Sequence, residues 1–206
     1  MSEKSKETML VKDVTSCSTA VVKALDKQII AQMNDVLPNA LVSIEDLNIQ
    51  IVGSAVHALL QPAAKEALRK AIKERNAKLS LISAYRTIAQ QLILCNHAAA
   101  GRCGITNAAR PGNSNHQSGL GLNISDPNGW EPFLEKQGWR RPLPDVPNYF
   151  EFVGGGTKDI RGVAVQAFQH LWNLNHPEDL LKVDGVFGPQ TEAKLGNSPI
   201  DGFPKS

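Results

Sequence analysis

The segment from Pro111 to Ile124 holds the residues whose types and spacing best suit a chemical site. In its second half, Leu and Ile alternate with Gly and Asn, so an extended strand would present apolar side chains on one face and almost no bulk on the other. Ser114 and His116 precede this strand, and Asn123 follows His116 by seven residues. The pattern predicts that an imidazole and an amide lie next to a strand face lined by glycine.

Three motifs resemble the zinc D-alanyl-D-alanine carboxypeptidase and dipeptidase family, which includes vancomycin-resistance carboxypeptidases and endolysin L-alanyl-D-glutamate peptidases. The stretch 114–123 is similar to the family's Ser-x-His-x-x-Gly-x-x-x-Asp, whose His and Asp bind zinc. Residues 83–87 read Ser-Ala-Tyr-Arg-Thr and resemble its Ser-x-Tyr-Arg-Thr segment. Gly138-Trp139 and the run 149–152 resemble its Gly-Trp and closing His-Phe-Glu-Tyr. The resemblance implies an α+β fold and a peptidase acting on peptidoglycan.

The zinc ligands of that family are incompletely matched. Asn123 stands where the resemblance implies Asp, and the closing segment fits two alignments. In one, Asp145 is the general base and Asn148 replaces the ligand His; in the other, Tyr149 replaces that His and Val146 the base. Neither alignment supplies an imidazole.

A catalytic zinc usually has three protein ligands, and neutral amide or phenol oxygens replace carboxylate and imidazole poorly. With His116 as the one retained ligand, we expect a degenerate metal site and no cofactor. Zinc is the expected cofactor if an altered site, for example one that recruits Asp126, still binds metal.

The resemblance also implies roles for side chains around the metal position. Arg86 would hold substrate oxygens, which suits a planar guanidinium, and Ser114 and Gln90 are further candidates for substrate binding. The structural alternative for Arg86 is an ion pair with an acid such as Glu151. Glu151 is also a candidate for positioning His116. We expect the catalytic acids or bases to be Asp145, Glu151 and Tyr149.

Three functions fit these observations. The first is a catalytically degenerate or repurposed relative, a pseudoenzyme, whose cleft binds a peptide, muropeptide or small amino-acid-like ligand. The second is an active peptidoglycan peptidase of the D-Ala-D-Ala carboxypeptidase type with an altered metal site. The third is a structural or interaction module, for which we expect a featureless or filled cleft.

The net charge, the N-terminal sequence and the cysteines limit which partners and which cellular compartment we expect. The 22 basic and 20 acidic residues give a net charge of +2, which argues against nucleic acid and anionic membranes as partners. The charged N-terminus lacks the features of a secretory signal, so we expect a cytoplasmic protein that reaches a cell wall only by lysis or dedicated delivery. Three cysteines form no metal motif. We expect them reduced, with Cys95 buried and a bridge to Cys103 in an exported form.

The expected fold is α+β, a small and mainly antiparallel sheet with flanking helices and a short helical C-terminal segment. Periodicity predicts an N-terminal helical segment over 1–39 and a carboxypeptidase-like core over 40–155. Gly154 to Gly156 marks a boundary. Beyond it, the segment 156–206 contains Asp184-Gly185 and Phe187-Gly188 before a helix, and resembles about half of a peptidoglycan-binding helical module. Predicted strands and helices within 40–155 include 47–51, a helix from Pro62, 79–84, a helix after Thr87, 120–124 and 149–153.

Overall fold

The computed structural model describes residues 8–204 and has the expected α+β architecture. Its α-helices are α1 (Lys23–Val36), α2 (Pro62–Arg75), α3 (Ile88–Ala99), α4 (Pro127–Lys136), α5 (Arg161–Asn175) and α6 (Pro189–Gly196). Its strands are β1 (Val42–Ser43), β2 (Ile49–Ile51), β3 (Leu59–Leu60), β4 (Leu79–Ser83), β5 (Gly121–Ile124), β6 (Trp139–Arg140) and β7 (Tyr149–Phe152). The helices and strands expected from the sequence are therefore confirmed to within a few residues at their ends.

Five strands form one sheet in the order β2-β4-β5-β7-β6, and only β2 and β4 run parallel. β1 and β3 form a separate antiparallel pair. Local chemistry sets several helix ends: Pro62 is the first residue of α2, and Thr87 accepts a hydrogen bond from the Gln90 amide at the start of α3. Asn76 ends α2 in the left-handed conformation.

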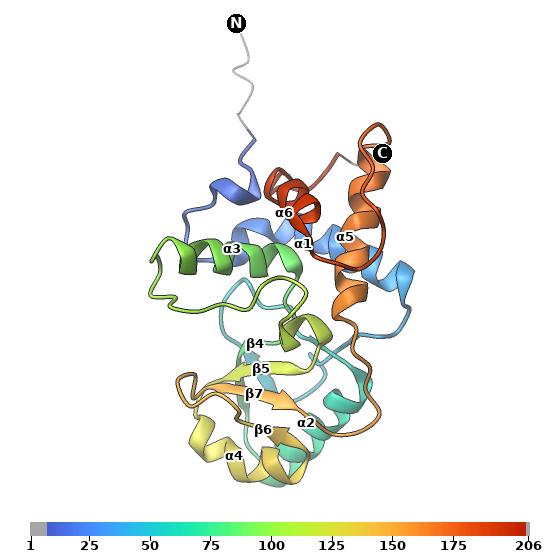
Figure 1. Ribbon diagram of the computed structural model, residues 1–206. Coiled ribbons are helices and arrows are strands. Elements are labelled where there is room, and N and C mark those ends of the chain that lie inside the picture. Colours follow the sequence, from blue (N-terminus) through green and yellow to red (C-terminus); the bar gives the residue numbers. More distant parts are fainter. Residues whose placement is uncertain (1–7, 205–206) are drawn as a thin grey trace, which may run out of the picture.

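The chain builds two hydrophobic cores, which Figure 1 shows as a helical layer above an α/β layer. The sheet packs with α2 and α4 around Trp130, Trp139 and Phe150. The other core joins α1, α3 and α5, with Leu25, Phe168 and other buried side chains. The N-terminal helix and the C-terminal segment thus share a core, although they lie far apart in the sequence.

A buried polar cluster connects the two layers. Asp26 of α1 is fully buried, and its carboxylate bonds the His57 Nε2 at 2.9 Å and the Thr87 hydroxyl at 2.5 Å. Burial raises the pKa of Asp26, and the hydrogen bonds from His57 and Thr87 counteract this. Because Thr87 follows Arg86, the cluster fixes the segment that carries the candidate substrate-binding arginine.

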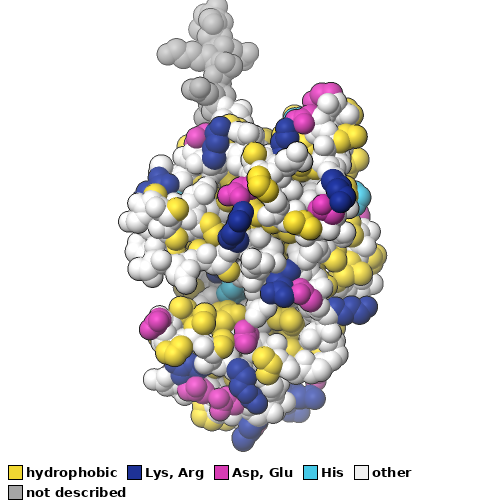
Figure 2. All heavy atoms as spheres, in the orientation of Figure 1, with side chains coloured by type: hydrophobic (Ala, Val, Ile, Leu, Met, Phe, Trp, Pro, Cys, Tyr) yellow, Lys and Arg dark blue, Asp and Glu magenta, His cyan; other side chains and the backbone are white. Residues whose placement is uncertain are grey.

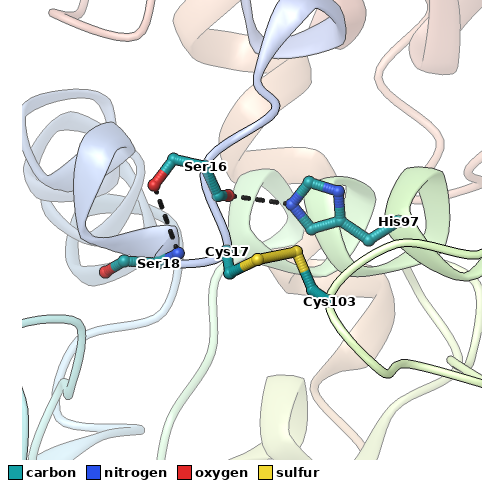
Figure 3. Close-up of a disulfide and its surroundings, with 5 residues drawn as sticks. All are labelled: Ser16, Cys17, Ser18, His97 and Cys103. Atoms are coloured by element: carbon teal, nitrogen blue, oxygen red, sulfur yellow. Dashed lines mark hydrogen bonds between the residues drawn. A yellow bond between two sulfur atoms is a disulfide. The ribbon is translucent and has the colours of Figure 1, made fainter.

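A disulfide joins Cys17, ahead of α1, to Cys103, in the loop after α3 (Figure 3). Beside it, the His97 Nε2 lies 2.9 Å from the Ser16 carbonyl. The expectation of three reduced cysteines is therefore wrong. The bridge expected for an exported form, between Cys95 and Cys103, is also wrong, because Cys103 pairs with Cys17. The bonded cysteines are 86 positions apart in the sequence, so no local signal pairs them. Only the packing of the N-terminal segment against α3 brings their Cα atoms to 5.5 Å.

Cys95 is the free cysteine and is half-buried rather than fully buried. Its thiol lies 3.0 Å from the Ala109 carbonyl. Among residues 8–204, no helix is both long enough and apolar enough to cross a membrane.

Candidate functional site

A cleft of about 470 Å³ opens between the helical layer and the sheet. Figure 2 shows this face of the molecule hollowed at mid-height, with apolar side chains along the lower margin. The polar side chains that line the cleft include Arg86, Ser114, His116, Asn123, Tyr149 and Glu151. Its apolar walls include Leu94, Ile105, Leu143 and Val146.

His116 is held in place by its own turn and by the strand beneath it. Ser114 caps the 3₁₀ turn η3 (Asn115–Ser118), with its hydroxyl accepting a hydrogen bond from the His116 amide. The imidazole lies over Gly121, where a Cβ would come within 3.1 Å of its Cγ. Such a contact is tighter than an ordinary van der Waals contact, so glycine lets the ring lie this close to β5 without any displacement.

The protonation of His116 follows from its surroundings. Its Nδ1 lies 2.6 Å from the Ala84 carbonyl. Burial, and then the charge of Arg86, lower the pKa of His116 to about 3, which hydrogen bonds to Ala84 and Asn123 only partly offset. The imidazole is neutral at neutral pH, and since a carbonyl can only accept, Nδ1 carries the proton and Nε2 the lone pair.

Asn123 lies beside both residues that the alignments place at the missing ligand position. Its amide donates a hydrogen bond to the Asn148 Oδ1 at 3.2 Å, and Tyr149 is its cross-strand partner on β7. The Tyr149 ring centroid lies 5.4 Å from that of His116. Burial, with the nearby charge of Glu151, raises the pKa of Tyr149 to about 12, so its phenol keeps its proton at neutral pH.

Arg86 enters the cleft without a carboxylate partner. Its guanidinium donates to the Gln91 Oε1 at 3.1 Å and to the Ser83 Oγ at 3.3 Å, and no carboxylate of residues 8–204 lies within ion-pair distance. Burial lowers the pKa of Arg86 to about 10, which still leaves it a cation at neutral pH. The structural alternative, an ion pair between Arg86 and Glu151, is wrong because Glu151 instead accepts a hydrogen bond from Asn115 at 2.7 Å.

Two neighbouring glutamines of α3 face different surroundings. Gln90, the expected substrate-binding residue, is buried and donates to Thr19 and to the Ala55 carbonyl, outside the cleft lining. Gln91 lines the cleft and supports Arg86. Sequence reasoning missed Gln91 because consecutive helical residues point about 100° apart, and the rotation of α3 is set by its packing.

The two candidate aspartates lie away from this group. Asp145 is exposed in the loop before β7 and does not line the cleft. Asp126 caps α4, pairs with Arg75 at 2.5 Å and also lies outside the cleft lining. Ser114, His116, Tyr149, Glu151 and Arg86 are thus brought together, whereas Asp145, Asp126 and Gln90 are not.

The donor set fits a catalytic zinc poorly. His116 offers the one imidazole in the cleft, and the oxygens beside it belong to neutral Asn123, Asn148 and Tyr149. Across residues 8–204, no three His, Cys, Asp or Glu side chains form a group that could hold a metal ion. The arrangement can hydrogen-bond a polar ligand and hold an anion.

Comparison with known proteins agrees with the motif resemblance. Residues 56–143 match the sequence model of the VanY D-alanyl-D-alanine carboxypeptidase family. This stretch is less than half of the chain; it contains Arg86 and the segment 114–123, and ends before Asn148 and Tyr149. The family expected from the motifs is therefore confirmed over these residues.

Five solved chains are significantly similar in structure. One belongs to a study of the LdcB LD-carboxypeptidase and the molecular basis of peptidoglycan recognition; it is 22% identical, with a TM-score of 0.46, and the match covers 60% of this chain and 73% of that one. No curated protein is significantly similar to the sequence.

Proposed function

We propose that the cleft binds a peptide or small amino-acid-like ligand through its carboxylate, and that the chain is a catalytically degenerate or repurposed relative of the zinc D,D-carboxypeptidases. The observation that carries this proposal is the unpaired Arg86 guanidinium beside neutral His116. A half-buried cation without a counter-ion is costly, and an anionic ligand would relieve that cost. A guanidinium can donate two parallel hydrogen bonds to one carboxylate, so a carboxylate is the favoured anion.

The open cleft also supports a binding function over a purely structural one. A volume of about 470 Å³ lies within the range of small-ligand sites. Its lining combines apolar walls with a few convergent polar groups, which is the usual composition of such sites.

One observation favours the second candidate, an active peptidoglycan peptidase with an altered metal site. Metal-binding histidines commonly donate the other ring N–H to a carbonyl or carboxylate, and His116 makes this bond to Ala84. If zinc bound here, His116 would hold it, and the metal would supply activation of water. Metal content separates the two candidates.

The first test is elemental analysis of zinc after purification without chelator, on the wild type and on His116→Ala. The proposal expects well below one zinc per chain in both proteins. Near-stoichiometric zinc that disappears in His116→Ala would overturn the degenerate-site assignment and favour the active peptidase, which an assay of D,D-peptide cleavage would then check.

The second test measures binding of N-acetyl-D-alanyl-D-alanine and of its C-terminal amide by calorimetry. We expect the acid to bind at least tenfold more tightly than the amide in the wild type, and Arg86→Gln to abolish this difference. Arg69→Gln is the matched control because Arg69 lies on α2 and pairs with Asp46. Equal binding of acid and amide by the wild type would contradict a carboxylate site at Arg86.

A further inference from the structure

The apolar walls of the cleft come from three separate segments of the chain. Leu94 lies on α3, Ile105 lies in the loop after α3, and Leu143 and Val146 lie in the loop before β7. Leu143 is 47% exposed and Val146 is 39% exposed, so the folded chain leaves much of both side chains in water. Single exposed apolar residues are ordinary on protein surfaces, but these four converge on one cleft.

The loop before β7 holds its two aliphatic side chains in a constrained backbone. Three prolines stand within residues 142–147, and each fixes its own φ angle. The Val146 amide donates to the Leu143 carbonyl at 3.1 Å, and the Tyr149 amide donates to the Val146 carbonyl at 3.0 Å. Leu143 and Val146 are therefore the two ends of one turn that leads into β7. A constrained loop of this kind loses little conformational entropy when a ligand binds.

The apolar side chain on α3 lies close to the residue that supports the cation. Leu94 follows Gln91 by three positions, so both side chains lie on the same side of the helix. The Gln91 Oε1 accepts a hydrogen bond from the Arg86 guanidinium at 3.1 Å. Both Leu94 and Gln91 line the cleft. The same face of α3 thus presents an apolar group and a group that positions a cation.

The rest of the lining carries little charge. Among the described residues that line the cleft, Arg86 and Glu151 are the charged ones, because the His116 imidazole is neutral at neutral pH. A small anion bound at Arg86 would satisfy the cation and leave the apolar walls in contact with water. An apolar group on the same ligand would cover these walls, and removing apolar surface from water is favourable.

We propose that Leu94, Ile105, Leu143 and Val146 form an apolar subsite, so that the cleft selects a carboxylic acid with a bulky apolar group over one with only methyl side chains. This inference rests on the proposed function, because Arg86 would hold the carboxylate of the same ligand. The volume of about 470 Å³ has room for a ligand of this kind.

Calorimetry with three acids tests the subsite: N-acetyl-D-alanyl-D-alanine, N-acetyl-D-alanyl-D-phenylalanine and N-phenylacetyl-D-alanyl-D-alanine. The last two carry a benzyl group at opposite ends of the dipeptide, so the pair samples both orientations of the ligand. We expect one of them to bind the wild type about tenfold more tightly than the first acid, a gain for which burial of roughly 60 Å² of apolar surface is enough.

The double variant Leu143→Ala with Val146→Ala should remove most of this gain and leave the affinity for N-acetyl-D-alanyl-D-alanine largely unchanged. Because both residues are exposed, their truncation should not unfold the chain, which circular dichroism melting verifies. Leu180→Ala is the matched control, since Leu180 is 65% exposed and does not line the cleft. A gain that persists in the double variant would overturn the assignment of the subsite.

The outcomes separate this inference from the proposed function. Equal binding of the three acids that depends on Arg86 would refute the apolar subsite and leave the carboxylate site standing. A benzyl gain that is equally large for the C-terminal amides and survives Arg86→Gln would support the apolar subsite and contradict the carboxylate site. If none of the probes binds, both proposals fail.

A second copy of the chain is the alternative occupant of these apolar walls. Sedimentation velocity of the wild type and of the double variant tests this alternative. We expect both proteins to be monomers at the concentrations used for calorimetry. A wild-type dimer that dissociates in the double variant would identify Leu143 and Val146 as part of an interface and overturn the ligand subsite.

Discussion

At the scale of single residues, the site depends on how closely His116 can approach β5. The ring lies against Gly121, and its Nδ1 is bonded to Ala84. The bond to Ala84 orients the imidazole, and burial together with the charge of Arg86 keeps it neutral at neutral pH. The contact with Gly121 leads to a prediction for Gly121→Ala, and the titration of the ring leads to a prediction for the pH dependence of stability.

Gly121→Ala should displace the imidazole, because the added Cβ would come within 3.1 Å of the His116 Cγ and of its backbone nitrogen. We expect a loss of stability of about 1–3 kcal/mol from overpacking, and about tenfold weaker binding of N-acetyl-D-alanyl-D-alanine. Urea denaturation and calorimetry measure the two effects. Gly155→Ala is the control, since a Cβ at Gly155 meets no atom within 4 Å. Wild-type affinity and stability in Gly121→Ala would show that the ring position is not constrained.

The pH dependence of stability should contain a contribution from His116. Its pKa is about 3 in the folded protein, against 6.5 for an ordinary histidine, so the unfolded chain binds more protons between these values. The stabilising contribution is complete above pH 6.5 and is lost as the pH falls toward 3, by up to about 1.4 kcal/mol per pH unit. Urea denaturation at pH 7 and pH 4.5 measures it.

His116→Gln should show a shallower fall in stability between these two pH values than the wild type. His170→Gln, which changes an exposed residue, should keep the wild-type slope. An unchanged slope in His116→Gln would mean that the imidazole titrates normally in the folded protein.

At the scale of elements, the loop after α3 forms one wall of the cleft. Ile105, Asn107 and Ala109 of this loop line the cleft, and Cys103 anchors its beginning to Cys17. The cytoplasmic location expected from the sequence stays a prediction. Disulfides persist mainly in oxidising compartments, so the redox state of this pair in cells bears directly on it.

Replacing both bonded cysteines, as Cys17→Ser with Cys103→Ser, should lower stability by about 2–4 kcal/mol, because the bond closes a long loop in the unfolded chain. We also expect weaker binding of N-acetyl-D-alanyl-D-alanine, since the wall of the cleft loses its anchor. Thermal melting and calorimetry measure these changes. Cys95→Ser is the control, because it removes a thiol that takes no part in the bond. If Cys95→Ser lowered stability and affinity as much as the double variant does, the disulfide would not be the anchor of this wall.

At the scale of the whole molecule, the C-terminal segment shares a core with the N-terminal helix. Ile160, Phe168 and Trp172 are buried in the same cluster as Leu25 and Ile29 of α1. The division into 1–39, 40–155 and 156–206 stays a prediction of the sequence. The shared core gives a direct test of whether the last segment folds independently.

A chain ending at Gly155 should lose its cooperative thermal transition or melt more than 10 °C lower, because buried side chains of α1 and α3 lose their α5 partners. Within the full chain, Phe168→Ala should cost about 3–5 kcal/mol. Leu174→Ala on the same helix should stay near wild type, since Leu174 is 68% exposed. A shortened chain that melts like the wild type would identify residues 156–206 as an appendage.

The sequence by itself determined the α+β class, most helices and strands, and the set of motifs around Arg86 and His116. These features depend on local patterns: apolar periodicity, proline and cap residues, and motif spacing along the chain. Residues 145–151, where two alignments of the closing motif fit, marked the limit of such patterns.

Only the tertiary structure decided that Gln91 rather than Gln90 faces the cleft, that Glu151 contacts Asn115 rather than Arg86, and that Cys17 pairs with Cys103. It also decided that the two ends of the chain share one core. Each of these outcomes depends on the rotation of a helix or on contacts between distant segments. Such arrangements are fixed by the packing of the whole chain, which leaves no signature at any single position.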